Sequence, residues 1–131
     1  MRVALIACCG KKADAPAPAR ELYRSPLFRK SVAWAERRGL PCAVLSARHG
    51  LVMPGDVLPP YDLTLARLPA GERAAWAARV NADLRRRLAG CEFVVLAGRL
   101  YRAALAGLPH TAPMAGLGIG RQLRWLTLDC S

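Results

Sequence analysis

The sequence contains little lysine, few acidic residues and no long apolar run. Only three of its 20 basic residues are lysines, and nine acidic residues leave a formal net charge of +11. Five cysteines are too few for a disulfide-rich scaffold, and no two have the Cys-x-x-Cys spacing of zinc or redox sites. No segment approaches the roughly 20 apolar residues that span a bilayer, and the apolar start is too short for a secretion signal. These absences predict a cytoplasmic protein with reduced thiols, no metal or other cofactor, and no membrane partner.

The chain does contain enough apolar material for a core. Its 131 residues are 53% hydrophobic and 22% charged, which excludes a disordered tail. The length fits one domain of ordinary size, and no repeat, low-complexity tract or linker divides it. We therefore expect a single domain over residues 1–131. The basic charge favours contact with a polyanion, but it indicates neither a fold nor a reaction.

Apolar runs alternate with helical patterns along the chain. Runs that end at glycine or proline predict buried strands, and apolar residues three or four apart predict helices. Ser25 followed by Pro26 is typical of a helix start, and a stripe that begins at Trp76 indicates a long helix. Strands are expected at 3–8, 42–46 and 92–97, with a short fourth near 110–114, helices at 26–38, 70–88, 99–107 and 118–126, and loops at 13–20 and 47–69.

Strands that alternate with helices imply right-handed crossovers and a sheet covered by helices. We expect an α/β fold, a single three-layer sandwich with a short, mostly parallel sheet of three to four strands and helices on both faces. In such sheets ligands bind beyond the carboxyl ends of the strands. The segments 8–12, 46–50 and 97–99 each follow a predicted strand, so they should converge on one pocket.

Lys11 and Lys12 follow the first predicted strand. Partial burial and a neighbouring cation both lower the pKa of an amine, as a nucleophilic or imine-forming lysine requires. Gly10 closes the strand, but the stretch lacks the earlier glycine and the following Ser or Thr of a phosphate loop. Cys9 is a candidate reactive thiol because two ammonium groups lie nearby in sequence. The simpler interpretation is a pair of solvated lysines at a loop, with the cysteine filling the core.

The segment after the second strand carries groups that can hold and protonate a ligand. Arg48 can grip a phosphate, a carboxylate or a nucleobase edge through its planar fork. His49 can give or take a proton near neutral pH, or it can be a hydrogen-bonded structural imidazole. Ser46 and the flexible Gly50 complete this expected binding segment.

Two further candidates lie in the long connection, and one lies near the end of the chain. Tyr61 offers a planar face on which a base can stack. Asp62, like Asp56, is a carboxylate among cations that can orient a water or hold a ribose hydroxyl, although aspartate also favours turns for local reasons. Arg121 follows a glycine-rich stretch that can present backbone N–H groups to an anion or form a tight loop.

Several of these residues carry a family resemblance. The motif Leu45-Ser46-Ala47-Arg48-His49-Gly50-Leu51-Val52, followed by Pro54, Asp56 and Pro60-Tyr61-Asp62-Leu63, resembles the signature loop of the YaaA-like superfamily. That superfamily includes a bacterial peroxide stress protein and small stand-alone domains, which this chain most resembles. Cys9-x-Lys11 and Tyr23-x-Ser25-Pro26 are also similar to the catalytic core of archaeosine synthase, where a Cys, a Lys, a Tyr and a Ser follow in the same order. That resemblance implies a lysine that bonds a deazaguanine base, and it adds Tyr23 and Ser25 to the expected binding residues.

The leading hypothesis is an enzyme that acts on a nucleobase or nucleoside, such as a modified or deazapurine base in nucleic acid. Its reaction would be of the transferase, lyase or N-glycosidase type. The expected catalytic residues are Lys11, Lys12, His49 and Asp62, and the expected substrate-binding residues are Cys9, Gly10, Tyr23, Ser25, Ser46, Arg48, Gly50, Tyr61 and Arg121.

Two other functions remain open from the sequence. One is a non-catalytic DNA- or RNA-binding stress-response protein whose arginine-rich helix face, with Arg73, Arg79 and residues 85–87, contacts phosphates. Its binding would fall steeply with salt, because counterion release scales with the phosphates neutralised. The other is a small-molecule binder without chemistry. Replacing Lys11 or His49 should abolish the activity of an enzyme, whereas replacing residues 85–87 should weaken a nucleic-acid binder.

Overall fold

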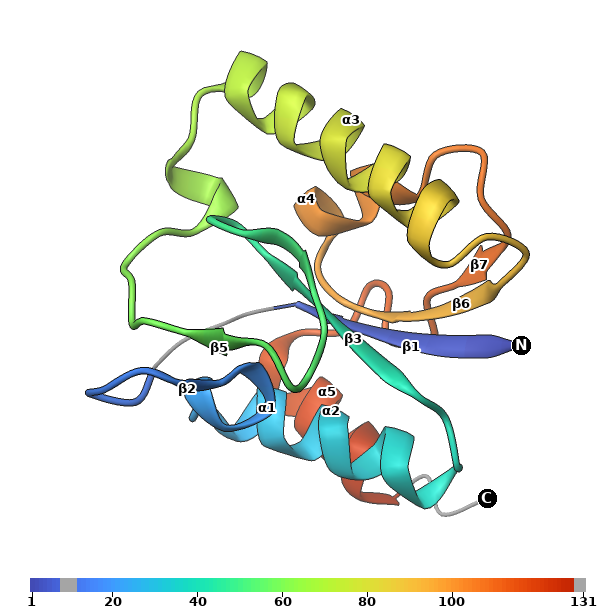
Figure 1. Cartoon of the computed structure of the whole chain (residues 1–131). Coiled ribbons are helices and arrows are strands. Elements are labelled where there is room, and N and C mark those ends of the chain that lie inside the picture. The colour runs from blue at the N-terminus through green and yellow to red at the C-terminus, as the bar shows by residue number, and fades with distance from the viewer. Residues whose placement is uncertain (8–11, 129–131) are drawn as a thin grey trace.

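The structure is a computed structural model that describes residues 1–7 and 12–128, and it has the expected α/β architecture. Its main sheet has five strands in the order β4-β3-β1-β6-β7 (Figure 1). β1 lies at the centre and pairs in parallel with β3 and β6, and β7 pairs in parallel with β6. The strand bounds are β1 Arg2–Ala7, β3 Cys42–Ser46, β4 Gly50–Val52, β6 Glu92–Leu96 and β7 His110–Thr111.

The sheet is larger than predicted, and it is mixed: β1, β3, β6 and β7 are parallel to one another, whereas one further strand is antiparallel. β4 runs antiparallel to β3, and the two strands form a hairpin in which Ser46 pairs with Gly50. Gly50 has a φ of +73°, the left-handed conformation that a short hairpin loop needs at one position. β7 is the short fourth strand expected near 110–114, whereas β4 was missed within the predicted loop 47–69, because three residues are too few to show an alternation of apolar and polar residues.

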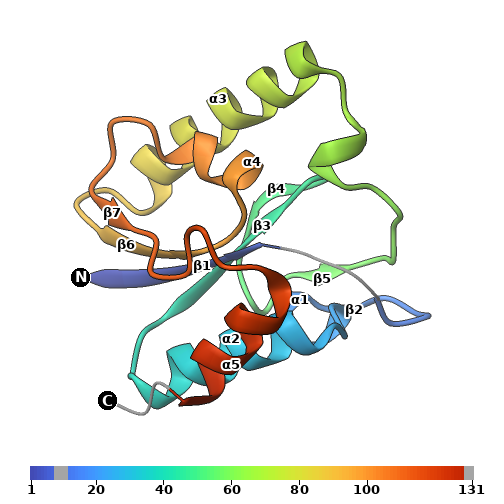
Figure 2. The same ribbon diagram turned by 180° about the vertical axis from the view of Figure 1, so that it is seen from behind.

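Helices cover both faces of the sheet (Figures 1 and 2). One face carries α1, α2 and α5, and the other carries α3 and α4. The bounds are α1 Ala19–Leu22, α2 Pro26–Arg37, α3 Ala70–Arg87, α4 Arg99–Arg102 and α5 Ile119–Leu128, with short 3₁₀ turns at Leu65–Arg67 and Ala103–Leu105. The first predicted helix starts as expected, because the Ser25 hydroxyl accepts a hydrogen bond from the Phe28 N–H.

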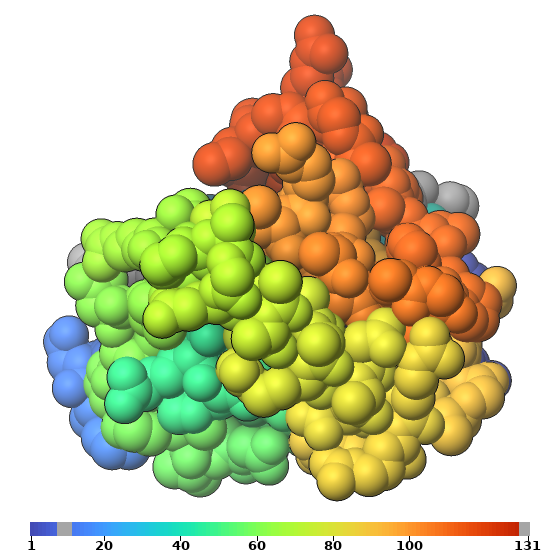
Figure 3. Space-filling view, turned by 90° about the horizontal axis from the view of Figure 1, so that it is seen from above, coloured from blue at the N-terminus to red at the C-terminus, as the bar shows by residue number. Residues whose placement is uncertain are grey.

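α3 packs its apolar stripe onto the sheet. Trp76, Val80 and Leu84 are all buried, as their spacing of four predicts. Viewed from above, α3 lies beside the segment that follows β6 (Figure 3). Asn81 joins the two by donating from its side-chain amide to the carbonyls of Ala104 and Ala106. α3 and the segment after β6 thus cover this face of the sheet together.

Both predicted loops contain regular structure. Residues 13–20 include β2, Ala17–Pro18, and the start of α1, and residues 47–69 include β4, β5 and a 3₁₀ turn. β5, Val57–Leu58, pairs antiparallel with β2 in a second, two-stranded sheet. These strands have two residues each, and proline tolerates such an edge position, so the prolines that indicated loops were misleading here.

None of the helices among the described residues is both long enough and apolar enough to cross a membrane.

Candidate functional site at the carboxyl ends of the strands

The site is built at the edge where β1, β3 and β6 end. Ala7, the last residue of β1, pairs with Leu45, so the end of β1 lies next to Ser46 at the end of β3. Residue 12, the first described residue after β1, forms an antiparallel bridge with Tyr23 just before α2. Parallel pairing and this bridge together bring residues 12, 23 and 46 to one end of the sheet.

Three hydroxyl groups form a chain at this edge. The Tyr23 and Tyr61 hydroxyls lie 2.7 Å apart, and the Tyr61 hydroxyl lies 2.6 Å from Ser46 Oγ. Ser46 Oγ also accepts a hydrogen bond from the His49 N–H at 3.1 Å. Ser46 and Tyr23 are buried, whereas Tyr61 is half-buried between them. The chain thus runs from a buried serine through a tyrosine at the rim to a second, buried tyrosine.

Lys12 lies against the two tyrosine rings. Its Nζ is 4.5 Å from the centroid of the Tyr61 ring and 5.7 Å from that of Tyr23. Both distances are within the range of a cation–π contact, in which the ring face attracts the ammonium group. Lys12 therefore occupies one face of Tyr61, the residue expected to stack on a base, and it places a positive charge beside the hydroxyl chain.

His49 approaches the same tyrosine from another direction. Its ring lies 5.3 Å from the Tyr61 ring, nearly perpendicular at 84°. Partial burial lowers the pKa of His49, and the charge of neighbouring Arg48 lowers it further. The neutral imidazole is therefore favoured near pH 7, so His49 can accept a proton there. Its backbone position comes from the hairpin loop between β3 and β4, which residues 47–49 form.

Trp76 supports the site from α3 and was not among the predicted site residues. Its indole Nε1 donates a hydrogen bond of 2.9 Å to the Ser46 carbonyl. Its ring meets Tyr101 of α4 edge to face at 5.5 Å. The sequence pattern placed Trp76 in the core, correctly, but spacing alone carries no sign of its hydrogen bond. Tyr101 lies two residues after the segment 97–99, which was expected to contribute to the site because it follows a predicted strand. Including one further helical turn after that strand would have identified Tyr101 as a site residue.

Five further predicted residues are described by the structure, and none of them is one of the three residues of the hydroxyl chain. Ser25 caps α2, and Gly50 provides the left-handed residue of the hairpin. Arg48 is exposed beside His49. Asp62 is also exposed and pairs with Arg67 at 3.2 Å. Arg121 lies in the first turn of α5, and Cys9, Gly10 and Lys11 lie outside the described residues.

A cavity of about 110 Å³ lies at the ends of β1 and β6. Its walls are mainly apolar, but Ser31 of α2, Tyr101 of α4 and Gln122 of α5 also line it. A wider groove of about 300 Å³ shares Ala97, Gly98 and Gln122 with this cavity and adds Arg99 and Arg102. Ala97 and Gly98 are thus common to a small apolar space and a basic groove at the same edge.

The arginines at the two ends of the sheet differ in whether their side chains contact other residues of the chain. At the end where β1 and β6 start and α2 and α3 finish, several arginines contact other residues of the chain. Arg2 pairs with Glu92, Arg37 donates to the Leu126 carbonyl and Arg86 pairs with Asp83. At the carboxyl ends of the strands, exposed arginines have no hydrogen bond or ion pair with another described residue, namely Arg24, Arg48, Arg99 and Arg121.

The predicted nucleic-acid face on α3 is largely engaged within the molecule. Arg85 donates to the side chain of Asn81 and to the Ala106 carbonyl, and Arg87 donates to the Leu51 carbonyl. Arg73, in the first turn, donates to the Leu68 carbonyl. The run of arginines at the end of α3 therefore ties the helix to its neighbours.

Within residues 1–7 and 12–128, no group of three or more His, Cys, Asp or Glu side chains is arranged to hold a metal ion.

A family model described as a family of unknown function, DUF6884, matches residues 3–128 of the chain. The chain belongs to DUF6884. No curated protein and no solved structure matches it significantly.

The DUF6884 match spans the whole site. It begins in β1 and ends with α5, so it includes both halves of the sheet and the hairpin that carries His49. The hydroxyl chain, the cavity at the end of β6 and the arginines at the strand ends are therefore parts of the DUF6884 domain itself, rather than of an appended segment.

Proposed function

We propose that this DUF6884 domain is an enzyme that acts on a nucleobase or nucleoside at the carboxyl ends of its strands. The observation that carries the proposal is the hydroxyl chain of Tyr23, Tyr61 and Ser46 beneath the Lys12 ammonium group. A module that only binds phosphates needs cations at its surface, but it has no use for buried hydroxyls joined in a row. Such a chain can pass a proton between the interior and a ligand at the rim.

The contacts assign a task to each side chain. Tyr61 would give or take a proton at the ligand, since its hydroxyl joins both other hydroxyls. The Lys12 ammonium group, beside the Tyr61 ring, would stabilise negative charge that develops on the phenol or the ligand. His49, favoured in its neutral form, would accept a proton at the rim. Lys12 and His49 thus remain proposed catalytic residues, Lys12 as a stabilising cation rather than a nucleophile, and Tyr61 gains a catalytic role.

The exposed arginines support a substrate that carries phosphate. Arg24, Arg48, Arg99 and Arg121 lie in four different segments at this edge, and each retains its five N–H donors for a ligand. Asp62 is the acidic exception among the predicted residues, and its charge is offset by Arg67. This distribution favours a nucleotide, or a nucleotide within a nucleic acid, over a free base.

The choice of a base as substrate rests on the resemblance to the YaaA-like superfamily and to the archaeosine synthase core. We retain this relationship as a proposal. The hairpin loop that carries Arg48 and His49 contains the residues of the signature motif, and those residues lie beside Tyr61, a later part of the same motif. Ser46, His49 and Tyr61 of the motif are thus in contact, which supports a functional role for this part of it, whereas Pro54 of the same motif lines a different cavity.

A panel of nucleosides, nucleotides and deazaguanines tests the proposal. The protein is incubated with each compound and with short oligonucleotides, products are followed by mass spectrometry, and binding is followed by NMR. We expect at least one member to be bound and converted. Tyr61→Phe should reduce the conversion by at least 100-fold while leaving binding within about threefold, since proton transfer contributes 10²–10⁴-fold in enzymes.

The matched control is Tyr101→Phe, which removes a phenol at the same edge but outside the hydroxyl chain. Conversion that is lost equally in both variants would contradict a specific relay through Tyr61. If no compound binds, or if binding occurs without conversion and is unaffected by Tyr61→Phe, an enzyme at this edge is ruled out for these substrates.

The competing function is nucleic-acid binding without chemistry, and the free arginines favour it as well. In that case affinity for an oligonucleotide should depend on Arg48 and Arg99 and fall steeply with salt. It should be independent of Ser46 and of the Tyr61 hydroxyl. The two functions therefore differ in whether the buried hydroxyls affect any measured rate.

A further inference from the structure

A second cavity, of about 160 Å³, lies between α2 and the sheet. Phe28 and Val32 of α2 form one wall, and Ile6 of β1 and Val44 of β3 form the other. Leu40, Cys42 and Pro54 complete the lining. An apolar cavity of about 150 Å³ is known to hold a benzene-sized molecule in proteins, so this one has room for a branched or aromatic group.

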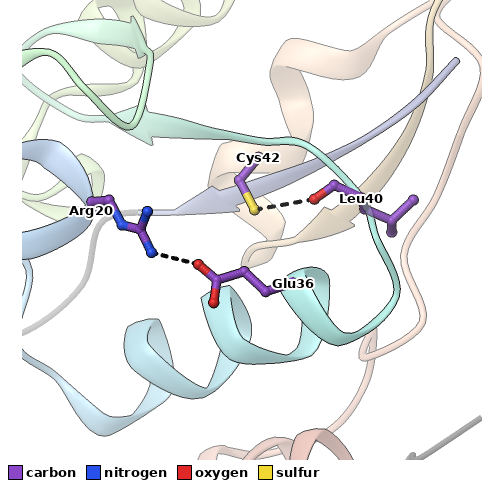
Figure 4. Close-up of polar contacts among 4 residues, drawn as sticks. All are labelled: Arg20, Glu36, Leu40 and Cys42. Carbon is purple, nitrogen blue, oxygen red and sulfur yellow. Dashed lines mark hydrogen bonds and ion pairs between the residues drawn. The ribbon is translucent and has the colours of Figure 1, made fainter.

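Two opposite charges lie side by side at this cavity. Arg20 of α1 and Glu36 of α2 both line it, and their side chains point toward one another, joined by an ion pair of 2.6 Å (Figure 4). Each side chain is about half exposed, at 54% and 53%. Cys42 projects from β3 on the same side, with its thiol directed at the Leu40 carbonyl 3.8 Å away. The cavity thus combines an apolar interior with a polar rim of zero net charge.

The rim is held in place by the backbone. The N–H groups of Ala19 and Arg20 donate to the carbonyls of Asp56 and Pro54, at 2.8 and 3.1 Å. The Asp56 carboxylate in turn accepts the Met53 N–H at 3.0 Å, which closes the turn that carries Pro54. Asp56, considered from the sequence as a catalytic carboxylate, therefore fixes a wall of this cavity. The arrangement keeps Arg20 at the rim whether or not its side chain pairs with Glu36.

We propose that this cavity binds a free α-amino acid with an apolar side chain. The side chain would fill the space between Phe28, Val32 and Val44, the carboxylate would bind Arg20 and the ammonium group would bind Glu36. This site does not depend on the function proposed for the strand ends.

The charge arrangement favours a zwitterion over a singly charged ligand. A ligand with only a carboxylate is attracted by Arg20 and repelled by Glu36. A ligand with only an ammonium group is attracted by Glu36 and repelled by Arg20. A zwitterion satisfies both partners at once. Exposed ion pairs contribute little to stability, so exchanging the direct Arg20–Glu36 pair for two pairs with the ligand costs little.

The binding test uses L-leucine and L-phenylalanine as probes, measured by NMR titration of the intact chain. The controls are glycine, which lacks the side chain, and 4-methylpentanoate and isoamylamine, each of which lacks one charge. We expect leucine to bind at least 50-fold more tightly than glycine, because each buried methylene contributes about fourfold. Each singly charged analogue should bind at least tenfold more weakly than leucine. Equal binding of leucine and 4-methylpentanoate, or no binding of either amino acid, would overturn the proposal.

Variants locate the site. Arg20→Gln and Glu36→Gln should each weaken leucine binding at least tenfold, and Val32→Phe should abolish it by filling the cavity. The matched control is Arg29→Gln, an exposed arginine on α2 that does not line the cavity. Leucine affinity that is unchanged by Arg20→Gln and Glu36→Gln would place the binding elsewhere and refute the assignment.

A measurement on the unmodified chain covers the case in which a variant fails to fold. Cys42 lines the cavity, whereas Cys91 lines a different groove with Leu84 and Phe93, so the two thiols are internal controls for each other. Saturating leucine should slow alkylation of Cys42 at least fivefold and leave Cys91 unchanged, as read by peptide mass spectrometry. Equal rates at Cys42 with and without leucine would show that the cavity is not the binding site.

Discussion

Trp76 and Ser46 are joined by a hydrogen bond from the indole Nε1 to the main-chain carbonyl across 2.9 Å, in a buried position. This contact ties the long helix α3 to the end of β3, where the hydroxyl chain begins. Because the contact is buried, no bulk water would replace the indole as a donor to this carbonyl.

Replacing this indole should therefore destabilise the domain. Trp76→Phe removes the donor, leaves a buried carbonyl without its partner and should lower the free energy of unfolding by about 2–4 kcal/mol, from the lost hydrogen bond and the smaller ring. Urea denaturation followed by circular dichroism measures the change. Trp125→Phe is the control, because Trp125 is only half-buried and should cost less. A cost for Trp76→Phe no larger than that of Trp125→Phe would contradict this role.

The hydroxyls of Ser46 and Tyr61 should act as a coupled pair. Ser46→Ala and Tyr61→Phe should each destabilise the domain by about 1–3 kcal/mol, since each removes the hydrogen bond between the two hydroxyls. Because they share one hydrogen bond, the double variant should be less destabilised than the sum of the two, by about 0.5–2 kcal/mol. A double-mutant cycle in urea gives this coupling. Strict additivity would mean that the 2.6 Å contact contributes nothing.

His49 should titrate below the usual range for histidine. Burial lowers its pKa first and Arg48 second, so Arg48→Gln should raise the pKa partway while burial keeps it low. A reaction that needs the neutral imidazole should then hold its rate near pH 7 and lose it as the pH falls through this lowered pKa. NMR titration of the ring measures the midpoint, with Arg124→Gln on α5 as the control. A midpoint that does not rise in Arg48→Gln would contradict the electrostatic contribution.

The thiol of Cys42 should be slow to alkylate at neutral pH. Burial raises its pKa, Glu36 raises it further, and Arg20 lowers it. Glu36→Gln should therefore increase the thiolate fraction and speed reaction with iodoacetamide, and Arg20→Gln should slow it. Because the pKa of the Cys42 thiol is higher in the folded protein than in the unfolded chain, its contribution to the free energy of unfolding is fully present below the unfolded-state pKa. That contribution is lost as the pH rises through the folded-state pKa. Changes of the same sign in both variants would contradict the opposed charges.

The arginines at the strand ends should bind anions more strongly than those at the end of α3. Arg48→Gln with Arg99→Gln should weaken binding of a phosphate polymer and reduce the slope of log affinity against log salt by about two, one unit for each lost contact. Arg85→Gln with Arg86→Gln should leave that slope unchanged, since both side chains are engaged within the chain. If the α3 variant reduced the slope and the strand-end variant did not, the nucleic-acid-binding face would lie on α3.

Long, strongly patterned elements were predictable from the sequence. The alternation of apolar runs and amphipathic stripes predicted the bounds of five elements to within about one residue, namely β1, β3, β6, α2 and α3. Each of these elements buries enough apolar side chains for its periodicity to be visible in the sequence. Tyr61 and Ser46 were both chosen as site residues, and the fold brings them into contact. What they do there was not foreseen, because a stacking tyrosine and a hydrogen-bonding tyrosine have the same local sequence.

The elements that were missed depend on distant partners. β2 and β5 have two residues each, and they exist because a turn near residue 55 meets the start of α1. Likewise, Asp62 could be recognised as a carboxylate in a basic region, but only the fold shows that Arg67 pairs with it at the surface. The local sequence pattern cannot predict an element or a contact whose partner lies tens of residues away in the chain.

The central place of β1 also bears on how the chain is made. β1 pairs on one side with β3, about 40 residues later, and on the other with β6, since Arg2 lies opposite Glu92. During synthesis, the first strand can gain one neighbour early, but its second edge stays open until β6 has left the ribosome. We therefore expect the half of the domain that carries Tyr23, Ser46 and Tyr61 to collapse first around an exposed apolar edge, which is the state in which a nascent chain of this kind is most prone to aggregate.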